Sequence, residues 1–239
     1  MDNNNLKNIK SMEYPGRLII IGKSLNNNNI VIYAITGRSP SSQARKLEIN
    51  KSLNQIIVKP TDEEILKKGN PDLLIYPAII INDGIIVSNG KHTDDIKLNY
   101  KNNLSSTEIL AKALKNWEYE PDEPTYTPRI SGCIAKDASL SIIKRSINGS
   151  CIKNIFQIPM IPGKGMMIAT YNGLNQNPVP SFEGEPKTVD LIYKNAESTA
   201  KAVYNALEPG KNKTDFRVTV TSVFQNKKNI DYYIINRND

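Results

Sequence analysis

Apolar residues in the first half of the chain fall in short, nearly unbroken runs rather than in strict alternation with polar ones. Residues 17–22 and 30–35 flank an asparagine-rich turn, and residues 73–82 and 85–88 flank an Asp-Gly pair. An Asp-Gly pair between two apolar runs is a strong signal for a two-residue β-hairpin turn. Because strands that are apolar on both faces need cover on both faces, the pattern predicts hairpins buried between other layers.

Two long helices are expected over residues 105–117 and 188–207. In the first, Ser105 or Ser106 can cap the free amides, and Glu108 suits the positive end of the helix dipole. A Pro-Gly pair ends the second. The residues expected on the buried faces of these helices are Leu110, Leu114, Trp117, Leu191, Ala196, Ala200 and Val203. Further strands are expected at residues 55–59, 129–135, 140–147, 151–158, 166–171, 216–224 and 230–235.

Many hairpin strands covered on both faces, together with two long helices, fit two antiparallel sheets packed on each other with helices outside. The expected fold class is therefore α+β, a four-layer αββα sandwich. No repeat and no long linker divides the chain, so residues 13–239 are expected to form a single domain. The polar segment 1–12 is expected to be a flexible N-terminal tail.

Composition limits the classes of function. Of the 239 residues, 39% are hydrophobic and 23% are charged, and no run approaches the ~18 apolar residues of a membrane helix. The polar start of the chain lacks a signal-peptide core, so a cytoplasmic location without a membrane partner is expected. The formal charge of +7 comes from scattered lysines without a nucleic-acid-binding motif, so nucleic acid is not expected as a partner. Cys133, Cys151 and the lone His92 lack the spacing of a metal site.

The stretch ITGRSPSSQAR, residues 35–45, follows an expected strand and carries two arginines and three serines. It lacks the glycine pattern of a P-loop, so an anion bound here would be held by side chains. Arg38 and Arg45 can each donate forked hydrogen bonds to phosphate, and Ser39 can add a donor. The alternative is a solvent-exposed turn with surface ion pairs.

Two further polar stretches carry candidate chemistry. NGKHTD, residues 89–94, contains the only histidine; a lone histidine is more often structural, although a polar loop at a strand end favours function. WEYEPDEPTYTPR, residues 117–129, offers Glu118 or Glu120 as a general base, and the alternative is an acidic surface loop stiffened by prolines. Tyr76 interrupts an apolar run, so its hydroxyl needs a partner in a core or a site.

Taken in order, these segments resemble the archaeal-type IMP cyclohydrolases. The segments are YPGRLIIIG, YAITGRSPSSQAR, the strand with Tyr76, SNGKHTD, YEPDEPTYTPRI and ATYNG, spanning about residues 14–182. The resemblance implies an αββα fold like that of the N-terminal nucleophile hydrolases without their nucleophile, which agrees with Met1. It also implies closure of 5-formamidoimidazole-4-carboxamide ribonucleotide (FAICAR) to IMP with loss of water, the last step of purine biosynthesis, without a cofactor.

The resemblance assigns roles to individual residues. The implied catalytic groups are Arg38, Tyr76, His92 and Glu118 or Glu120, and the implied substrate-binding groups are Arg17, Ser39, Arg45, Asn89, Thr93, Asp94, Tyr126 and Arg129. One arginine of the 35–45 stretch would hold the 5′-phosphate and another a transient oxyanion. Pro40 departs from the family, in which an aromatic residue usually follows the Arg-Ser pair, and residues 62–72 and 172–186 look longer.

At least a homodimer is expected, because the sandwich of this family often assembles further. Two other functions stay open on sequence alone. A non-catalytic purine-nucleotide-binding protein would keep nucleotide affinity without ring closure. An amide hydrolase of the same fold would need a nucleophile exposed by removal of the N-terminal tail.

Overall fold

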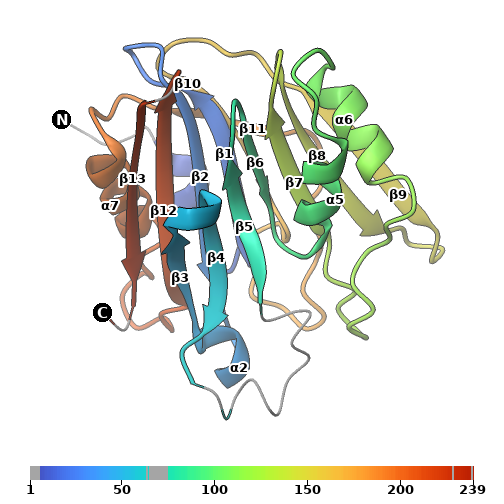
Figure 1. Cartoon of the computed structure of the whole chain (residues 1–239). Coiled ribbons are helices and arrows are strands. Elements are labelled where there is room, and N and C mark those ends of the chain that lie inside the picture. Colours follow the sequence, from blue (N-terminus) through green and yellow to red (C-terminus); the bar gives the residue numbers. More distant parts are fainter. Residues whose placement is uncertain (1–5, 63, 65–74, 228, 238) are drawn as a thin grey trace.

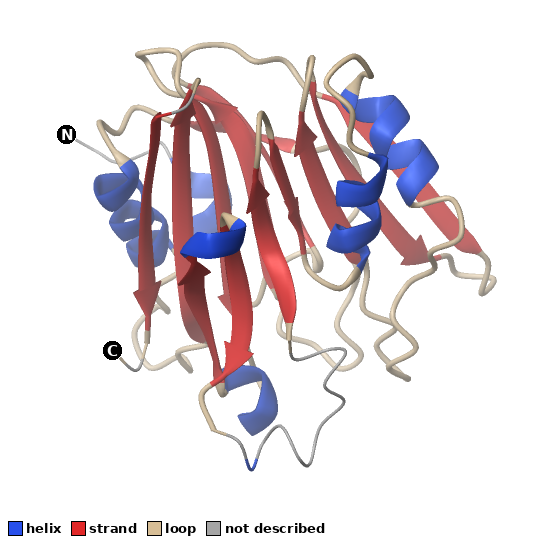
Figure 2. Ribbon diagram, viewed as in Figure 1, coloured by secondary structure: helices blue, strands red, loops and turns tan. Residues whose placement is uncertain are grey.

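Two antiparallel sheets lie face to face in the computed structural model (Figures 1 and 2), which describes residues 6–62, 64, 75–227, 229–237 and 239. Within these residues, one sheet has six strands in the order β11-β10-β1-β2-β12-β13, and the other has seven in the order β3-β4-β5-β6-β7-β8-β9. Every pairing between these strands is antiparallel. The predicted α+β sandwich of two antiparallel sheets is confirmed.

The strands of the six-stranded sheet are β1 (Arg17–Lys23), β2 (Asn29–Thr36), β10 (Lys164–Ala169), β11 (Lys187–Asp190), β12 (Arg217–Asn226) and β13 (Asn229–Asn236). Those of the seven-stranded sheet are β3 (Arg45–Asn50), β4 (Gln55–Pro60), β5 (Tyr76–Ile81), β6 (Ile85–Ser88), β7 (Arg129–Ile134), β8 (Ala138–Arg145) and β9 (Cys151–Gln157). The described helices are α1 (Lys7–Lys10), α2 (Pro40–Gln43), η2 (Lys51–Leu53), α5 (His92–Asn99), α6 (Ser106–Ala113) and α7 (Ala196–Ala206).

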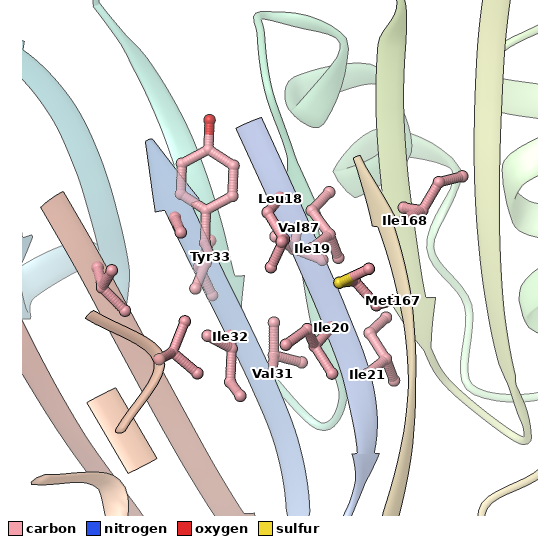
Figure 3. Packing of buried hydrophobic residues seen from close by; sticks show 14 of the residues in the cluster. Leu18, Ile19, Ile20, Ile21, Val31, Ile32, Tyr33, Val87, Met167 and Ile168 are labelled. Carbon is pink, nitrogen blue, oxygen red and sulfur yellow. The ribbon is translucent and has the colours of Figure 1, made fainter. Parts of the chain in front are cut away.

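The central strands β1 and β2 are buried on both faces, as their apolar runs predict. Ile21 of β1 points between the sheets, toward Gly132 of β7. Its neighbour Ile20 points to the opposite face, where it lies near Leu191. Figure 3 shows side chains of β1 and β2 packed together with Val87 of β6 and with β10. The main core therefore fills the space between the sheets and continues beyond the six-stranded sheet.

Helices cover the outer faces. Helix α7 packs on β12 and β13, while α5 and α6 pack on strands from β5 to β9 (Figure 1). An apolar cluster under α5 and α6 includes Ile96, Leu110 and Cys133. Helix α6 starts as predicted, with Ser105 as N-cap in a capping box with Glu108. None of the described helices is long and apolar enough to cross a membrane.

The second long helix begins later than predicted. Residues 187–190 form β11, which pairs with β10, and α7 begins at Ala196 behind the N-cap Asn195. The predicted start at residue 188 is wrong because β-branched residues at this point suit an edge strand. The capping box between Asn195 and Ser198 marks the true start.

Helix α5 and strand β3 are among the elements that the prediction missed. Residues 89–94 are not a loop throughout, because α5 begins at His92. Strand β3 follows the 35–45 stretch and alternates buried Arg45 and Leu47 with half-buried polar residues. Such a strand offers no apolar run, because at a sheet edge its other face meets solvent.

The flexible-tail prediction is wrong for residues 6–12, whereas residues 1–5 lie outside the described part. Leu6, Ile9 and Met12 are buried, and α1 contacts α7. Three apolar side chains spaced three apart form a small hydrophobic face that packs on the core. The strand expected at 73–82 is β5, and residues 73 and 74 lie outside the described part.

One side chain ties the edges of the two sheets together. Asn236 of β13 accepts a hydrogen bond from the Leu47 amide at 2.8 Å and donates to the Leu47 carbonyl at 3.2 Å. Among the described strands, β13 and β3 are edges of their sheets. The Asn236 amide therefore satisfies both backbone groups of Leu47 that an adjoining strand would otherwise pair with.

Gly132 lies at a close approach of the two sheets. A Cβ at this position would lie 2.4 Å from Ile21 Cδ1 and 3.1 Å from Val87 Cγ1. We expect Gly132→Ala to lower the free energy of unfolding by ~1–3 kcal/mol through overpacking, measured by urea denaturation. Gly210→Ala is the control, because among the described residues its Cβ would meet Lys213 alone, at 3.9 Å. An unchanged urea midpoint for Gly132→Ala would contradict this packing.

Candidate active site

Ends of strands from both sheets gather at the end of the sandwich where α2 lies (Figure 1). Polar side chains that these strands carry act on one another electrostatically. Strands β1, β3 and β5 begin there with Arg17, Arg45 and Tyr76, and β2 ends there after Tyr33. All four side chains are buried. Buried polar groups brought together from four strands require a shared function or an internal hydrogen-bond network.

Strand alternation aims the two arginines between the sheets. Arg17 shares one face of β1 with Ile21, which meets the opposite sheet. Arg45 shares one face of β3 with Leu47, which belongs to the main core. Both guanidinium groups therefore extend into the same inter-sheet space from opposite layers.

A bulge in β5 aims Tyr76 in the same direction. Ile79 pairs with Ile56 and Tyr76 pairs with Val58, with a register shift between the two pairs. Without the shift, residues three apart on a strand would point to opposite faces. The extra residue restores Tyr76 to the face of Ile79, and bulges of this kind often re-aim a side chain beside a functional site.

The two arginines lack enough partners. Each is only 8% exposed, and Arg17 Nε, Arg45 Nε and Arg45 Nη1 are buried without a hydrogen-bond partner among the described residues. Burial, and then the charge of Arg17, lower the pKa of Arg45. Buried donors that repel each other are costly unless an anion joins them, so this arrangement is suited to binding an anionic group.

Two tyrosine hydroxyls lie beside the arginines. Tyr33 and Tyr76 are hydrogen bonded to each other at 2.9 Å. Burial, and then Tyr76, raise the pKa of Tyr33 well above its usual value, so this phenol stays protonated. Since a hydrogen bond between two hydroxyls uses only one of their protons, the pair keeps one O–H to donate elsewhere.

The acidic loop contributes Glu120, which is 5% exposed, whereas Glu118 is exposed. Glu120 lies 3.6 Å from Arg129 Nη1, and its amide donates to the Thr127 carbonyl at 2.9 Å. Burial raises the pKa of Glu120, while Arg17 and Arg129 act in the opposite direction. A buried carboxylate that accepts protons more readily than usual, beside cations, is suited to general base catalysis.

Residues of the NGKHTD stretch form hydrogen bonds to the end of the acidic loop and the start of β7. Asn89 donates to the Pro128 carbonyl at 2.9 Å and accepts from the Ile130 amide at 2.8 Å. Thr93 is buried and bonded to the Gly90 carbonyl at 2.7 Å. Asn89 therefore uses both ends of its amide to fix the backbone on either side of Arg129.

His92 is fully buried under the same loop. Its Nε2 lies 3.3 Å from the Ile130 carbonyl, and its Nδ1 has no partner among the described residues. Burial, and then the charge of Arg129, lower the pKa of His92 to about 3. The imidazole is therefore neutral at physiological pH and is not poised to exchange protons there.

Four predicted residues make their described contacts with groups other than the inter-sheet arginines and tyrosines. Arg38 donates to Asn175 Oδ1 at 3.2 Å and to the Gln176 carbonyl at 2.7 Å, and its guanidinium lies 5.0 Å from the Tyr14 ring centroid. Asp94 is exposed on α5. Tyr126 packs against Arg145, whose Cζ lies 4.4 Å from its ring centroid. The fourth is Ser39, the N-cap of α2.

Pro40 occupies the start of α2, directly after the Ser39 cap. Proline is favoured at the first helical position because its fixed φ suits the helix and no amide is left unpaired. Pro40 therefore has a local role in closing the turn between β2 and β3.

Sequence reasoning missed Tyr33, Tyr171 and the residues that shape the acidic loop. Tyr171 is hydrogen bonded to Thr127 Oγ1 at 2.8 Å, and Asp122 accepts from the Thr127 amide at 2.6 Å. Tyr33 interrupts an apolar strand just as Tyr76 does, so the same signal was available for it. No sequence signal, however, indicates that Tyr33 of β2 and Tyr76 of β5 would be hydrogen bonded to each other.

The fold and the cluster together define a class: an α+β two-sheet protein with a buried, cationic, tyrosine-lined site suited to a small anionic substrate. The chain belongs to the family of IMP cyclohydrolase-like proteins, whose family model matches residues 14–229. The family expected from the sequence is confirmed.

Archaeal IMP cyclohydrolases are similar to most of the chain. One from Methanococcus maripaludis is 29% identical over 183 residues, covering 76% of this chain and 86% of the relative. Another strain's protein is 26% identical over 212 residues, covering 89% and 98%. The protein from Methanosphaera stadtmanae is 28% identical over 192 residues, covering 80% and 85%. A solved structure of Anbu from a Hyphomicrobium strain covers 93% of this chain and 88% of its own, with a TM-score of 0.34 and 9% identity, which does not establish the expected likeness to N-terminal nucleophile hydrolases.

The buried arginines generate a test of anion binding. We expect Arg45→Met to raise the melting temperature in phosphate-free buffer, because it removes a poorly partnered buried charge. Inorganic phosphate should raise the melting temperature of the parent protein and have little effect on this variant. Lys46→Met, at the neighbouring position paired with Glu48, is the control. A variant that phosphate stabilises as much as the parent would remove Arg45 from the anion site.

The buried imidazole generates a test of stability against pH. The unfolded chain protonates His92 near its ordinary pKa of 6.5, and the folded chain only near 3. His92 therefore contributes stability above pH 6.5 that is lost as the pH falls toward 3. Between pH 6.5 and 5, the urea midpoint of the parent should fall more steeply than that of His92→Gln. Equal slopes would contradict a buried, neutral histidine.

Proposed function

We propose that this protein is an IMP cyclohydrolase that closes FAICAR to IMP with loss of water. Membership of the family and the names of its archaeal relatives support the reaction. The observation that carries the proposal is the convergence of the buried Arg17, Arg45, Tyr76 and Glu120 at one end of the sandwich. These groups supply cation, hydroxyl donor and base, which are the chemical needs of an intramolecular condensation.

The chemistry needs positioning and proton transfer. The carboxamide nitrogen attacks the formyl carbon of the same molecule, and the formyl oxygen becomes a hydroxyl on a tetrahedral carbon. That hydroxyl then leaves as water, with one proton taken from the carboxamide nitrogen and one from the formamido nitrogen. Because both reacting groups are on one ring, an enzyme gains most by holding them in the attacking rotamer and by stabilising the developing oxyanion.

In this proposal the arginines bind the negatively charged groups of the substrate and of the transition state. The free donors of Arg45 suit the 5′-phosphate, because a guanidinium makes forked hydrogen bonds to phosphate oxygens. Of the arginines that act on Glu120, Arg17 has the largest electrostatic effect on its pKa. Arg17 therefore suits the oxyanion that develops beside the base. Arg38 at the rim is assigned to substrate entry, together with Ser39, and Arg129 is assigned to holding Glu120.

Glu120 is the proposed base and proton shuttle. Its raised pKa lets it take a proton from the carboxamide nitrogen and return one to the leaving hydroxyl. The free O–H of the Tyr33–Tyr76 pair donates to the formyl oxygen as charge develops there. Asn89, Thr93 and His92 are assigned to support of the loop, and Asp94 and Tyr126 to the outer surface near the site.

Three further properties belong to the proposal. The substrate is a purine ribonucleotide rather than a nucleic acid, the enzyme works in the cytoplasm, and it assembles at least as a homodimer. Light scattering of the purified protein tests the last of these. Of the three functions left open by the sequence, the names of the relatives favour neither a non-catalytic binding protein nor an amide hydrolase.

The two candidate glutamates provide a matched pair of variants. We expect Glu120→Gln to lower kcat for ring closure by ~10²-fold or more, since it removes a general base. Glu118→Gln should stay close to the parent, because its side chain is exposed and its carbonyl, not its carboxylate, contacts Arg129. The rate is measured as the increase in ultraviolet absorbance when purified protein is mixed with FAICAR.

The parent rate should fall at low pH, because Glu120 must be ionised to act and its pKa is raised. Binding of IMP by calorimetry accompanies the assay. A parent protein that binds IMP yet does not turn over FAICAR would be a binding protein, and the proposed reaction would be wrong. If Glu118→Gln lost activity and Glu120→Gln did not, the assignment of the base would be reversed.

A further inference from the structure

The guanidinium of Arg129 rests on the ring of Trp117, with Cζ 4.8 Å from the ring centroid. The indole itself is anchored, because its Nε1 donates to Asp95 Oδ2 of α5 at 2.6 Å. The centroid of the His92 ring lies 5.6 Å from that of the indole. The hydrogen bond to α5 therefore fixes the orientation of the Trp117 ring independently of Arg129. A ring face held in one orientation favours binding of a cation over it.

The remaining contacts of Arg129 orient it toward the site. Its Nε donates to the Glu118 carbonyl at 2.8 Å, and its Nη1 lies 3.6 Å from Glu120 Oε1. A Cβ on Gly90 would lie 3.1 Å from Nη1, so the guanidinium also packs closely against the backbone at that point. With its Nε bonded to the Glu118 carbonyl and one face stacked on the indole, the guanidinium of Arg129 is held with Nη1 beside Glu120.

We propose that Trp117 and Asp95 are positioning residues for Glu120, acting through Arg129. The inference rests on the proposed function, in which Glu120 moves the protons. It assigns a role to α5 and to the turn that follows α6 (Ser106–Ala113), in which Trp117 lies. Asp95 orients the indole by a hydrogen bond, and the indole orients the guanidinium by stacking. The guanidinium in turn positions the Glu120 carboxylate and favours its ionised form.

The charges acting on Glu120 make the effect measurable. Arg17, Arg129 and Arg45 favour its ionised form, and Asp122 opposes it. If Arg129 loses its platform, Glu120 loses one of these three cations, and protonation should occur at higher pH. A purely structural contribution from Trp117 would change stability without moving the acid limb of the kcat profile.

The first experiment measures kcat for FAICAR closure against pH in Trp117→Leu and Asp95→Asn. The acid limb should move to higher pH by about half a unit or more in Trp117→Leu, and in the same direction in Asp95→Asn. Tyr204→Leu is the matched control, because Arg217 lies 4.7 Å from the Tyr204 ring in an equivalent stack anchored by Asp215. Its acid limb should coincide with that of the parent. Unmoved limbs in both test variants would overturn the inference.

The second experiment needs no turnover. Trp117 is the only tryptophan in the chain, so its emission, excited selectively over that of the tyrosines, reports on the surroundings of this one indole. The emission should change as Glu120 titrates, and Glu120→Gln should abolish that transition. Protonation of His92, near pH 3, would appear as a separate event. A transition that persists unchanged in Glu120→Gln would refute the coupling, even if the parent proved to have no cyclohydrolase activity.

Discussion

Two buried arginines without a matching pair of buried carboxylates constrain this structure. Arg17 and Arg45 extend into one space from opposite sheets, and among the described residues Glu120 is the one buried acidic side chain. A poorly paired buried charge costs several kcal/mol. The doubly covered strands of the sandwich supply the burial that offsets this cost. The same imbalance gives the site its selectivity, because only a ligand with negative charge relieves it.

The fold could be predicted because burial on both faces leaves a direct record in the sequence. Unbroken apolar runs and an Asp-Gly turn identify the inner hairpins, and two buried layers demand helices outside. Elements at the edge or on the surface of the sandwich have weaker sequence patterns. Strand β3 and helix α5 each bury only part of their surface, so their patterns are mixed with polar residues. The start of α7 depends on a cap at Asn195 that sits beyond an edge strand of similar composition.

The site could be predicted only in part, because its geometry depends on pairings between distant segments. The sequence points to Arg45, Tyr76 and the acidic loop, but it does not distinguish Glu118 from Glu120. Hydrogen bonds across the loop bury one carboxylate and expose the other. The bulge that turns Tyr76 inward also has no local signature, since it exists only in the register between β4 and β5. Such features follow from the assembled sheets rather than from any one segment.

The side-chain bridge from Asn236 to Leu47 has a consequence for how this sandwich can meet other chains. A sheet edge with free backbone groups is a template for an added strand, whether in a native assembly or in an aggregate. Here the side chain of Asn236, on the edge strand β13, bonds the backbone amide and carbonyl of Leu47 on the edge strand β3. This side of the molecule therefore offers fewer free backbone groups to an added strand. The bridge therefore disfavours strand addition at this side, whereas β9 and β11 end the described sheets on the opposite side.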